Sequence, residues 1–168
     1  MGRLFRPDEV YPSVKEISVR ALKNRDIRIV FCDLDNTLAR WNDSFIPAYS
    51  RAFASALYKN RIDLCLISNN SRERVYPAAQ ALKAMFVPNA RKPRPAAIKK
   101  TLAKKGISPE KAVMIGDQVI TDMLSGNLAK IHTILINPID PTHEYGGTKV
   151  NRFMERIVCF FFRIQRTR

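Results

Sequence analysis

The chain has 168 residues, of which 46% are hydrophobic, 29 are lysine or arginine and 15 are aspartate or glutamate. This length favours one domain with a sizeable core, and the apolar content excludes a chain that is disordered throughout. The formal net charge of +14 favours anionic partners, namely nucleic acid, phosphate esters or an acidic membrane surface, without distinguishing among them.

The expected cellular location follows from the absence of a membrane-spanning run, a secretory signal and a full set of paired cysteines in the sequence. No apolar run approaches the ~18 residues of a membrane span, and no apolar core follows Arg3 and Arg6, so no secretory signal is predicted. The cysteines, Cys32, Cys65 and Cys159, cannot all pair with one another. The first two lie in apolar runs and are predicted to be small buried hydrophobes. We therefore expect a reducing, cytoplasmic location.

Strand-like and helix-like segments alternate along the chain. Short apolar runs predict strands at 27–32, 64–67, 112–115 and 132–136. Helical spacing or helix-favouring composition predicts helices at 47–59, 72–85, 95–105 and 121–129. This order predicts an α/β fold, a doubly wound parallel sheet with helices on both faces. Residues 1–168 are predicted to form one domain, in which segment 1–26 has room for a short helix at 14–23 and predicts no function.

A pair of carboxylates follows the first predicted strand. Asp33 and Asp35 are two residues apart, and alternate side chains of a strand point the same way, so both would leave its tip on one side. Ligands bind at the carboxyl ends of the strands in open α/β sheets. The pair is therefore a candidate catalytic centre, with an acidic strand-to-loop turn as the alternative.

Three further polar sites lie at the ends of later elements. Ser68, Asn69 and Asn70 follow the second predicted strand and offer neutral donors suited to a phosphoryl oxygen. Lys92 precedes the helix at 95–105. Asp117 follows the third strand, with Asp122 shortly after it. Each site alone is weak evidence, but a doubly wound sheet brings these ends together, so the set predicts one catalytic centre.

The ordered set resembles the motifs of the haloacid dehalogenase (HAD) superfamily of phosphotransferases. The residues that match them in chain order are Asp33-x-Asp35-x-Thr37, Ser68, Lys92, and Gly116-Asp117 with Asp122. The resemblance implies that Asp33 is the nucleophile and forms an aspartyl-phosphate. It also implies that Asp35 is first the general acid for the leaving group and then the base for water.

The same resemblance implies the binding roles. Lys92 and Ser68 would hold the phosphoryl oxygens, and Thr37, Asn69 and Asn70 would contribute to substrate binding. Asp117 would ligate Mg²⁺ together with Asp33 and the backbone carbonyl of Asp35, while Asp122 would support Lys92. Mg²⁺ and Lys92 would offset the repulsion between a phosphate dianion and a carboxylate nucleophile, and Mg²⁺ prefers oxygen ligands.

The spacing of the motifs excludes a cap domain. About thirty residues separate Thr37 from Ser68, about twenty separate Asn70 from Lys92, and predicted helices use much of both intervals. An uncapped site suits a substrate that is large or is held at a surface. Trp41, which follows the first motif, is a weak candidate for a substrate contact at the entrance.

The chain is most similar to the YqeG-type phosphatases of HAD subfamily III A, from about Pro7 to Arg156. Beyond the motifs, the likeness is carried by Leu38 with Trp41, Gly126-Asn127, the segment 138–141 and the segment 149–156. It implies phosphatidylglycerophosphate phosphatase activity, in which loss of the terminal phosphate leaves phosphatidylglycerol. One departure is Cys32, where the family often has Phe or another apolar residue, and we expect no catalytic consequence.

The C-terminal segment 151–168 carries a separate signal. If it is helical, its arginines fall within one arc of roughly 80°, opposite an aromatic and aliphatic face. These arginines are Arg152, Arg156, Arg163 and Arg166. The pattern is typical of a helix in a lipid interface, and a helix packed on the sheet is the alternative. Either arrangement leaves the arginines for anionic head groups, which predicts peripheral contact with the inner face of the membrane.

Two other functions are compatible with the composition. A soluble phosphatase for a nucleotide or a nucleic-acid phosphate end would also suit an uncapped basic protein, although the sequence contains no RNA-binding module. A non-enzymatic basic binding protein is the other alternative. It would not need the intact set of Asp33, Asp35, Lys92 and Asp117. The sequence predicts no oligomeric state.

Overall fold

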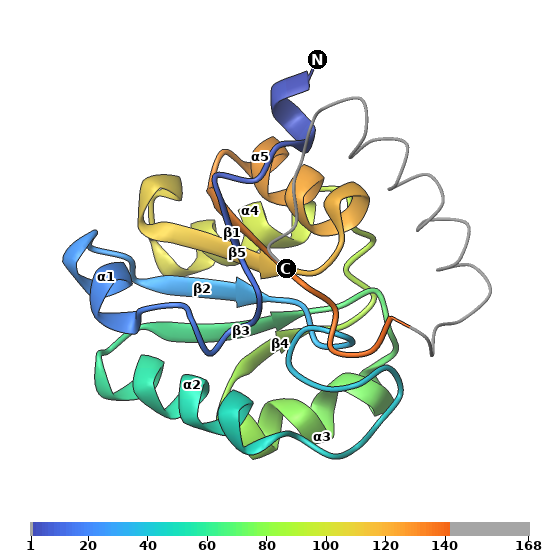
Figure 1. Ribbon diagram of the computed structural model, residues 1–168. Coiled ribbons are helices and arrows are strands. Elements are labelled where there is room, and N and C mark those ends of the chain that lie inside the picture. The colour runs from blue at the N-terminus through green and yellow to red at the C-terminus, as the bar shows by residue number, and fades with distance from the viewer. Residues whose placement is uncertain (1, 142–168) are drawn as a thin grey trace.

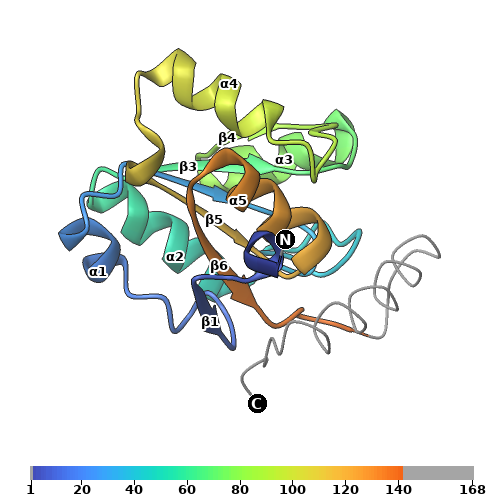
Figure 2. The ribbon, with the colours of Figure 1, turned by 90° about the horizontal axis from the view of Figure 1, so that it is seen from above.

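The computed structural model describes residues 2–141 and contains a six-stranded parallel sheet in the order β1-β6-β5-β2-β3-β4. The strands are β1 (Glu9–Tyr11), β2 (Ile29–Cys32), β3 (Asp63–Ile67), β4 (Met85–Val87), β5 (Ala112–Gly116) and β6 (His132–Ile136). Strands β1 and β4 lie at opposite edges of the sheet (Figure 2). The predicted parallel α/β fold is confirmed.

Helices cover both faces of the sheet. They are α1 (Val19–Asn24), α2 (Ala48–Lys59), α3 (Arg72–Leu82), α4 (Ala96–Lys105) and α5 (Leu124–Ala129), with shorter turns η1 (Gly2–Phe5), η2 (Pro109–Lys111) and the π-helical η3 (Val119–Met123). Helices α1, α2 and α3 pack on one face, and α4 and α5 pack on the other (Figure 1). This two-sided cover is the doubly wound arrangement that the sequence predicts.

The central strand β2 is buried on both faces, which explains its unbroken apolar sequence. Val30 packs in the same core as Phe53 of α2, whereas its neighbour Phe31 packs in the opposite core with Ile98 of α4. Successive strand residues point to opposite faces, so a strand with helices on both sides needs apolar residues at every position. Cys32 and Cys65 are both buried, as predicted from their apolar surroundings.

Two helices and the two edge strands differ from the sequence predictions in the following ways. The helix predicted over 72–85 ends at Leu82, because Lys83 adopts a left-handed conformation (φ 52°) and ends the helix, and Met85 begins the edge strand β4. The helix predicted over 121–129 is α5 preceded by the π-helical turn η3. Strands β1 and β4 have three residues each, too few for a periodic pattern, so pairing with the sheet determines them.

The N-terminal segment completes the sheet. The Asp8 carboxylate accepts hydrogen bonds from the backbone N–H (2.8 Å) and hydroxyl (3.0 Å) of Thr133, beside the pairing of β1 with β6. Asn127 of α5 donates to the backbone carbonyls of Leu4 (2.7 Å) and Arg6 (3.0 Å). The helix predicted at 14–23 is shorter and later, and its N-cap hydroxyl, on Ser18, accepts from the N–H of Ala21.

The connections between strands place no extra domain over the sheet. The interval from β2 to β3 holds a loop and α2, and the interval from β3 to β4 holds α3. None of the helices within residues 2–141 is both long and apolar enough to cross a bilayer. The helix predicted at 151–168, with Arg152, Arg156, Arg163 and Arg166, lies outside the described residues, as does Cys159.

Candidate active site

The polar residues predicted to form a site meet at one edge of the sheet. Strands β3, β2 and β5 are adjacent and parallel, so their carboxyl ends lie together. Asp33 follows β2, Ser68 follows β3, and Asp117 follows β5. All three residues are buried, although each is charged or polar. The sheet topology therefore brings together groups that are far apart in the sequence, at the edge where α/β proteins bind ligands.

A tight turn shapes the loop after Asp33. Asn36 adopts the left-handed region (φ 61°), which asparagine tolerates better than most residues. Its N–H donates to the carbonyl of Ala39 (2.7 Å), and the N–H of Leu38 donates to the carbonyl of Leu34 (2.9 Å). The turn places the Thr37 hydroxyl 3.3 Å from Asp117 Oδ1, to which it donates. The first and fourth motifs are thereby in direct contact.

The buried side chain of Lys92 contacts two buried carboxylates. Its ammonium Nζ donates to Asp33 Oδ1 and to Asp122 Oδ1, both at 2.6 Å. The side chains of Lys92, Asp33 and Asp122 are 4%, 10% and 1% exposed, so water screens these contacts little. One lysine is therefore shared between the acid that follows β2 and the acid of η3.

The buried cluster around Lys92 contains more carboxylates than ammonium groups. Carboxylate oxygens of Asp33, Asp117 and Asp122 lie within 4.8 Å of one another. Burial, followed by the charges of Asp122 and Asp117, raises the pKa of Asp33 well above its ordinary value, even though Lys92 opposes the shift. Burial lowers the pKa of Lys92, but the carboxylates of Asp122 and Asp33 outweigh it and raise that pKa. The cluster thus holds a charged lysine and a surplus of negative charge.

Gly116 and η3 allow Asp122 to approach the end of β5. A Cβ atom on Gly116 would lie 2.3 Å from both Cγ and Oδ2 of Asp122, closer than any real contact. Asp122 Oδ2 accepts a hydrogen bond from the N–H of Gln118 (3.1 Å), while Oδ1 accepts from Lys92. Both oxygens of Asp122 are therefore bound within the protein.

The residues after β3 hold the loop that carries Lys92. The Asn69 amide donates to the Lys92 carbonyl (3.0 Å) and accepts from the Lys92 N–H (2.7 Å). The Ser68 hydroxyl accepts from the N–H of Asn70 (3.1 Å), and the Ser68 carbonyl accepts from the N–H of Ala90 (2.9 Å). Asn69 thus contacts the backbone of Lys92 from the next motif.

Asp35 has its own cation, which the sequence analysis missed. Arg74 donates to Asp35 Oδ1 through Nη2 (2.6 Å) and Nε (3.1 Å). Asn70 Nδ2 donates to the other oxygen, Oδ2 (2.7 Å), and the N–H of Asn42 donates to Oδ1 (3.1 Å). The available signal was position: Arg74 lies in the first turn of α3, where the helix dipole disfavours a cation. The two acids of the first motif therefore have separate cationic partners.

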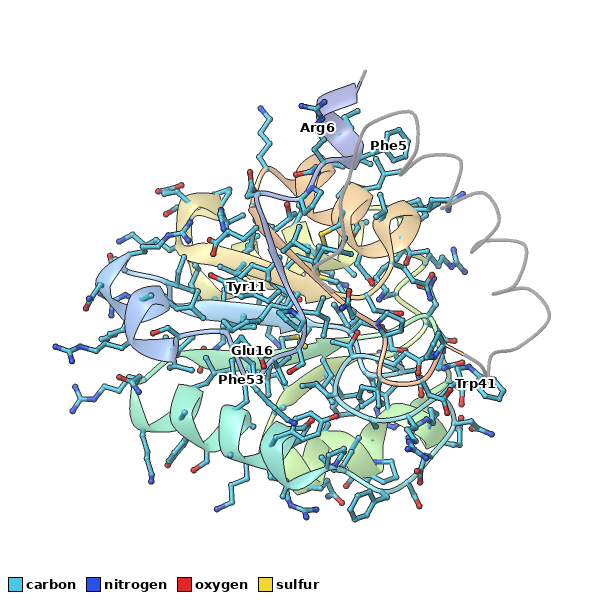
Figure 3. All side chains as sticks on the ribbon, viewed as in Figure 1. Phe5, Arg6, Tyr11, Glu16, Trp41 and Phe53 are labelled. Atoms are coloured by element: carbon cyan, nitrogen blue, oxygen red, sulfur yellow. The ribbon has the colours of Figure 1, made fainter. Side chains whose placement is uncertain are left out.

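The loop between the first motif and α2 presents aromatic residues. Trp41 is partly buried, and Figure 3 shows it on the side of the molecule toward which the strands point. Phe45, further along this loop, is 61% exposed, and the guanidinium of Arg51 lies 5.8 Å from its ring centroid. The loop thus combines exposed apolar surface with a nearby positive charge.

Comparisons with known proteins show the class to which this fold belongs. Residues 89–138 match the HAD-hydrolase-like family model. The probable phosphatase YqeG of Bacillus subtilis strain 168 is 32% identical over 156 residues, which cover 93% of this chain and 90% of that protein. The parallel sheet and the acids at its carboxyl edge thus belong to a HAD-like phosphatase, an enzyme that hydrolyses phosphomonoesters. Within that class, the chain belongs to the family of YqeG.

Solved structures share the fold at lower identity. An uncharacterised protein from Listeria monocytogenes serotype 4b has a TM-score of 0.57 at 13% identity, over 79% of this chain and 98% of that one. The 3-deoxy-D-manno-octulosonate 8-phosphate phosphatase of Moraxella catarrhalis, solved with magnesium, phosphate and its sugar, has a TM-score of 0.52 at 16% identity, over 85% and 92%. At these identities the likeness concerns the fold alone.

Proposed function

We propose that this phosphatase works through an aspartyl-phosphate on Asp33, with Mg²⁺, and that it dephosphorylates phosphatidylglycerophosphate at a membrane surface. The observation that carries the chemistry is the buried contact of Lys92 with Asp33 at the carboxyl edge of the sheet. A carboxylate nucleophile must approach a phosphate dianion, and a buried cation in contact with that carboxylate offsets the repulsion.

The reaction consists of two displacements. An oxygen of Asp33 forms a bond to phosphorus while the bond from phosphorus to the ester oxygen breaks, and the departing alcohol oxygen takes a proton from Asp35. Water then attacks the phosphorus of the aspartyl-phosphate and gives a proton to Asp35. The bond from phosphorus to Asp33 breaks, which releases inorganic phosphate and restores both acids.

The residues of this edge fit a divalent cation. Three buried carboxylates with oxygens within 4.8 Å of one another, against one lysine, leave negative charge that a hard cation would neutralise. We assign Mg²⁺ to Asp33, Asp117 and the backbone carbonyl of Asp35, since both oxygens of Asp122 already accept hydrogen bonds within the protein. When bound, Mg²⁺ supplies positive charge to the phosphoryl oxygens.

The remaining polar residues divide into substrate-binding and positioning groups. Ser68 and Lys92 are proposed to bind the phosphoryl oxygens, and Thr37 to share this role beside Asp117. Asn69 was predicted to bind substrate, but its amide is bonded twice to the backbone of Lys92, which supports a positioning role. Asn70 was also predicted to bind substrate, but its amide donates a hydrogen bond to the side chain of Asp35, which supports a positioning role for it as well. Asp122 is proposed to orient Lys92.

Several observations support a lipid substrate. Within residues 2–141 no domain is inserted over the site, the net charge is +14, and exposed Phe45 lies on the loop that follows the first motif. The resemblance to YqeG-type phosphatases points to phosphatidylglycerophosphate as that lipid. The proposal includes peripheral contact with the inner face of the membrane, through Arg152, Arg156, Arg163 and Arg166, and therefore a cytoplasmic enzyme.

Phosphate release from phosphatidylglycerophosphate in mixed micelles tests the proposal. We expect release with Mg²⁺, none with EDTA, and none from Asp33→Asn. A matched control is Asp63→Asn, which should retain full activity because Asp63 lies at the amino end of β3, away from the carboxyl ends of the strands that carry the site. Release from a nucleotide or a generic ester but not from the lipid would reject the lipid substrate and keep the phosphatase chemistry.

A further inference from the structure

The ion pair of Arg74 with Asp35 is incompatible with proton transfer from Asp35 to the leaving group, the role proposed for Asp35. Arg74 Nη2 and Nε both donate to Oδ1, at 2.6 and 3.1 Å, while Asn70 donates to Oδ2. The side chains of Arg74 and Asp35 are only 14% and 10% exposed. A carboxyl group held by several donors is turned toward them, so it must leave Arg74 in order to reach the oxygen of a leaving group.

Separating this pair has a consequence for Arg74. Its guanidinium also donates to the carbonyl of Arg40, at a long 3.4 Å. A largely buried cation that loses its carboxylate is strongly destabilised unless another anion replaces it. Because Asp35 moves toward the leaving group, the vacated position on Arg74 faces that same part of the substrate. The replacement anion would therefore belong to the leaving alcohol.

We propose that Arg74 is a specificity-determining residue that binds a second anionic group on the leaving alcohol and thereby releases Asp35 for catalysis. This inference rests on the proposed function, in which Asp35 acts on the leaving group. The substrates selected are phosphomonoesters whose alcohol carries a second phosphate, a phosphodiester or a carboxylate. The phosphodiester of phosphatidylglycerophosphate satisfies this requirement, and so does the second phosphate of a soluble bisphosphate.

The test compares three phosphomonoesters that share a glycerol leaving group. Glycerol 3-phosphate leaves a neutral alcohol, glycerol 1,3-bisphosphate leaves an alcohol with a second phosphate, and short-chain phosphatidylglycerophosphate leaves an alcohol with a phosphodiester. We expect the wild type to prefer both anionic leaving groups in kcat/KM. Arg74→Gln should lower kcat/KM for those two substrates by about 10- to 100-fold, the range of a charge-assisted hydrogen bond. It should not lower the value for glycerol 3-phosphate and should raise it, because Asp35 then need not leave an ion pair before it acts.

Arg72→Gln is the matched control, because Arg72 begins the same helix and stacks over the rings of Tyr76 and Phe86 instead of contacting Asp35. It should leave the substrate preference unchanged. Arg74→Lys should retain part of that preference, because it keeps the charge but loses the planar guanidinium. The inference is overturned if Arg74→Gln lowers kcat/KM equally for all three substrates while Arg74→Lys keeps activity but shows no substrate preference. In that case Arg74 only supports Asp35.

The failure of the proposed function has a different signature. If the wild type hydrolyses none of the three substrates, the function is wrong, and the inference falls with it. If the bisphosphate is preferred and the lipid is not hydrolysed, the role of Arg74 stands and the lipid assignment is lost. Hydrolysis of the lipid by the wild type therefore tests the proposed function. The loss of the preference for anionic leaving groups in Arg74→Gln tests the role of Arg74.

Discussion

Asp122 occupies the space that a side chain at Gly116 would need, since a Cβ atom there would lie 2.3 Å from the Asp122 Cγ. We therefore expect Gly116→Ala to displace Asp122 from Lys92 and to lower kcat by roughly 10²-fold or more, the scale of losing one preorganised electrostatic contact. Overpacking should also reduce the free energy of unfolding by about 1–3 kcal/mol. Steady-state kinetics and thermal unfolding measure the two effects.

Gly106→Ala provides the comparison for this substitution. Gly106 has a left-handed backbone (φ 63°), and a Cβ atom there would meet nothing within 4 Å. The backbone cost should be about 1 kcal/mol of stability, with unchanged kcat. If both variants lost the same activity, the close approach of Asp122 to Gly116 would not matter for catalysis.

The contribution of Asp33 to the stability of the metal-free protein should fall as pH rises. Burial raises the pKa of Asp33 well above its ordinary value of 3.8, so between the two values its folded state binds more protons than its unfolded state. The part of the free energy of unfolding that Asp33 contributes therefore decreases from about pH 4 upward, by about 1.4 kcal/mol for each unit of pKa difference. Melting temperatures in EDTA across this range measure the slope.

Mg²⁺ should remove part of this loss, because it neutralises the surplus negative charge around Asp33 and stabilises the state that binds it. The gain in melting temperature on adding Mg²⁺ should thus widen as pH rises. Asp33→Asn should show a flatter pH dependence in EDTA and a smaller gain. Equal slopes for the wild type and the variant would show that Asp33 is not the group responsible.

Loss of the Asn69 side chain should affect catalysis through Lys92. Asn69→Ala removes the hydrogen bonds of 3.0 and 2.7 Å to the Lys92 backbone, and each is worth about 1 kcal/mol. We expect kcat to fall by about tenfold or more, since the ammonium is then less well placed. Asn60→Ala removes the hydrogen bond that the Asn60 amide donates to the carbonyl of Ala56 in α2, and it should leave kcat unchanged. An unchanged kcat in Asn69→Ala would contradict the positioning role.

The N-terminal strand should contribute to stability and not to catalysis. Asp8→Ala leaves the Thr133 N–H and hydroxyl without the carboxylate that accepts from both, which should cost about 1–3 kcal/mol. Chemical denaturation measures this cost, and phosphatase assays at 25 °C should show full activity. A loss of activity without a loss of stability would contradict this prediction, because it would mean that Asp8 affects the active site.

The central strands were predictable because burial on both faces leaves a simple pattern. The runs at 27–32 and 112–115 became β2 and β5 with shifts of at most two residues. The edge strand β4 was not predicted, and its first residue, Met85, was assigned to a helix, since three residues are too few to show a pattern. Its hydrogen bonds with β3 outweigh the local preference for helix.

For the site, the order and spacing of Asp33, Lys92 and Asp117 determined the class of chemistry, because each residue alone has common structural uses but the ordered set does not. The tertiary structure alone decided the partners. In it, Lys92 forms ion pairs with both Asp33 and Asp122. Asn69 forms a hydrogen bond to the backbone of Lys92, and Arg74 forms an ion pair with Asp35. Sequence patterns record what each segment needs locally, whereas these contacts join segments that only the packing of the sheet and helices brings together.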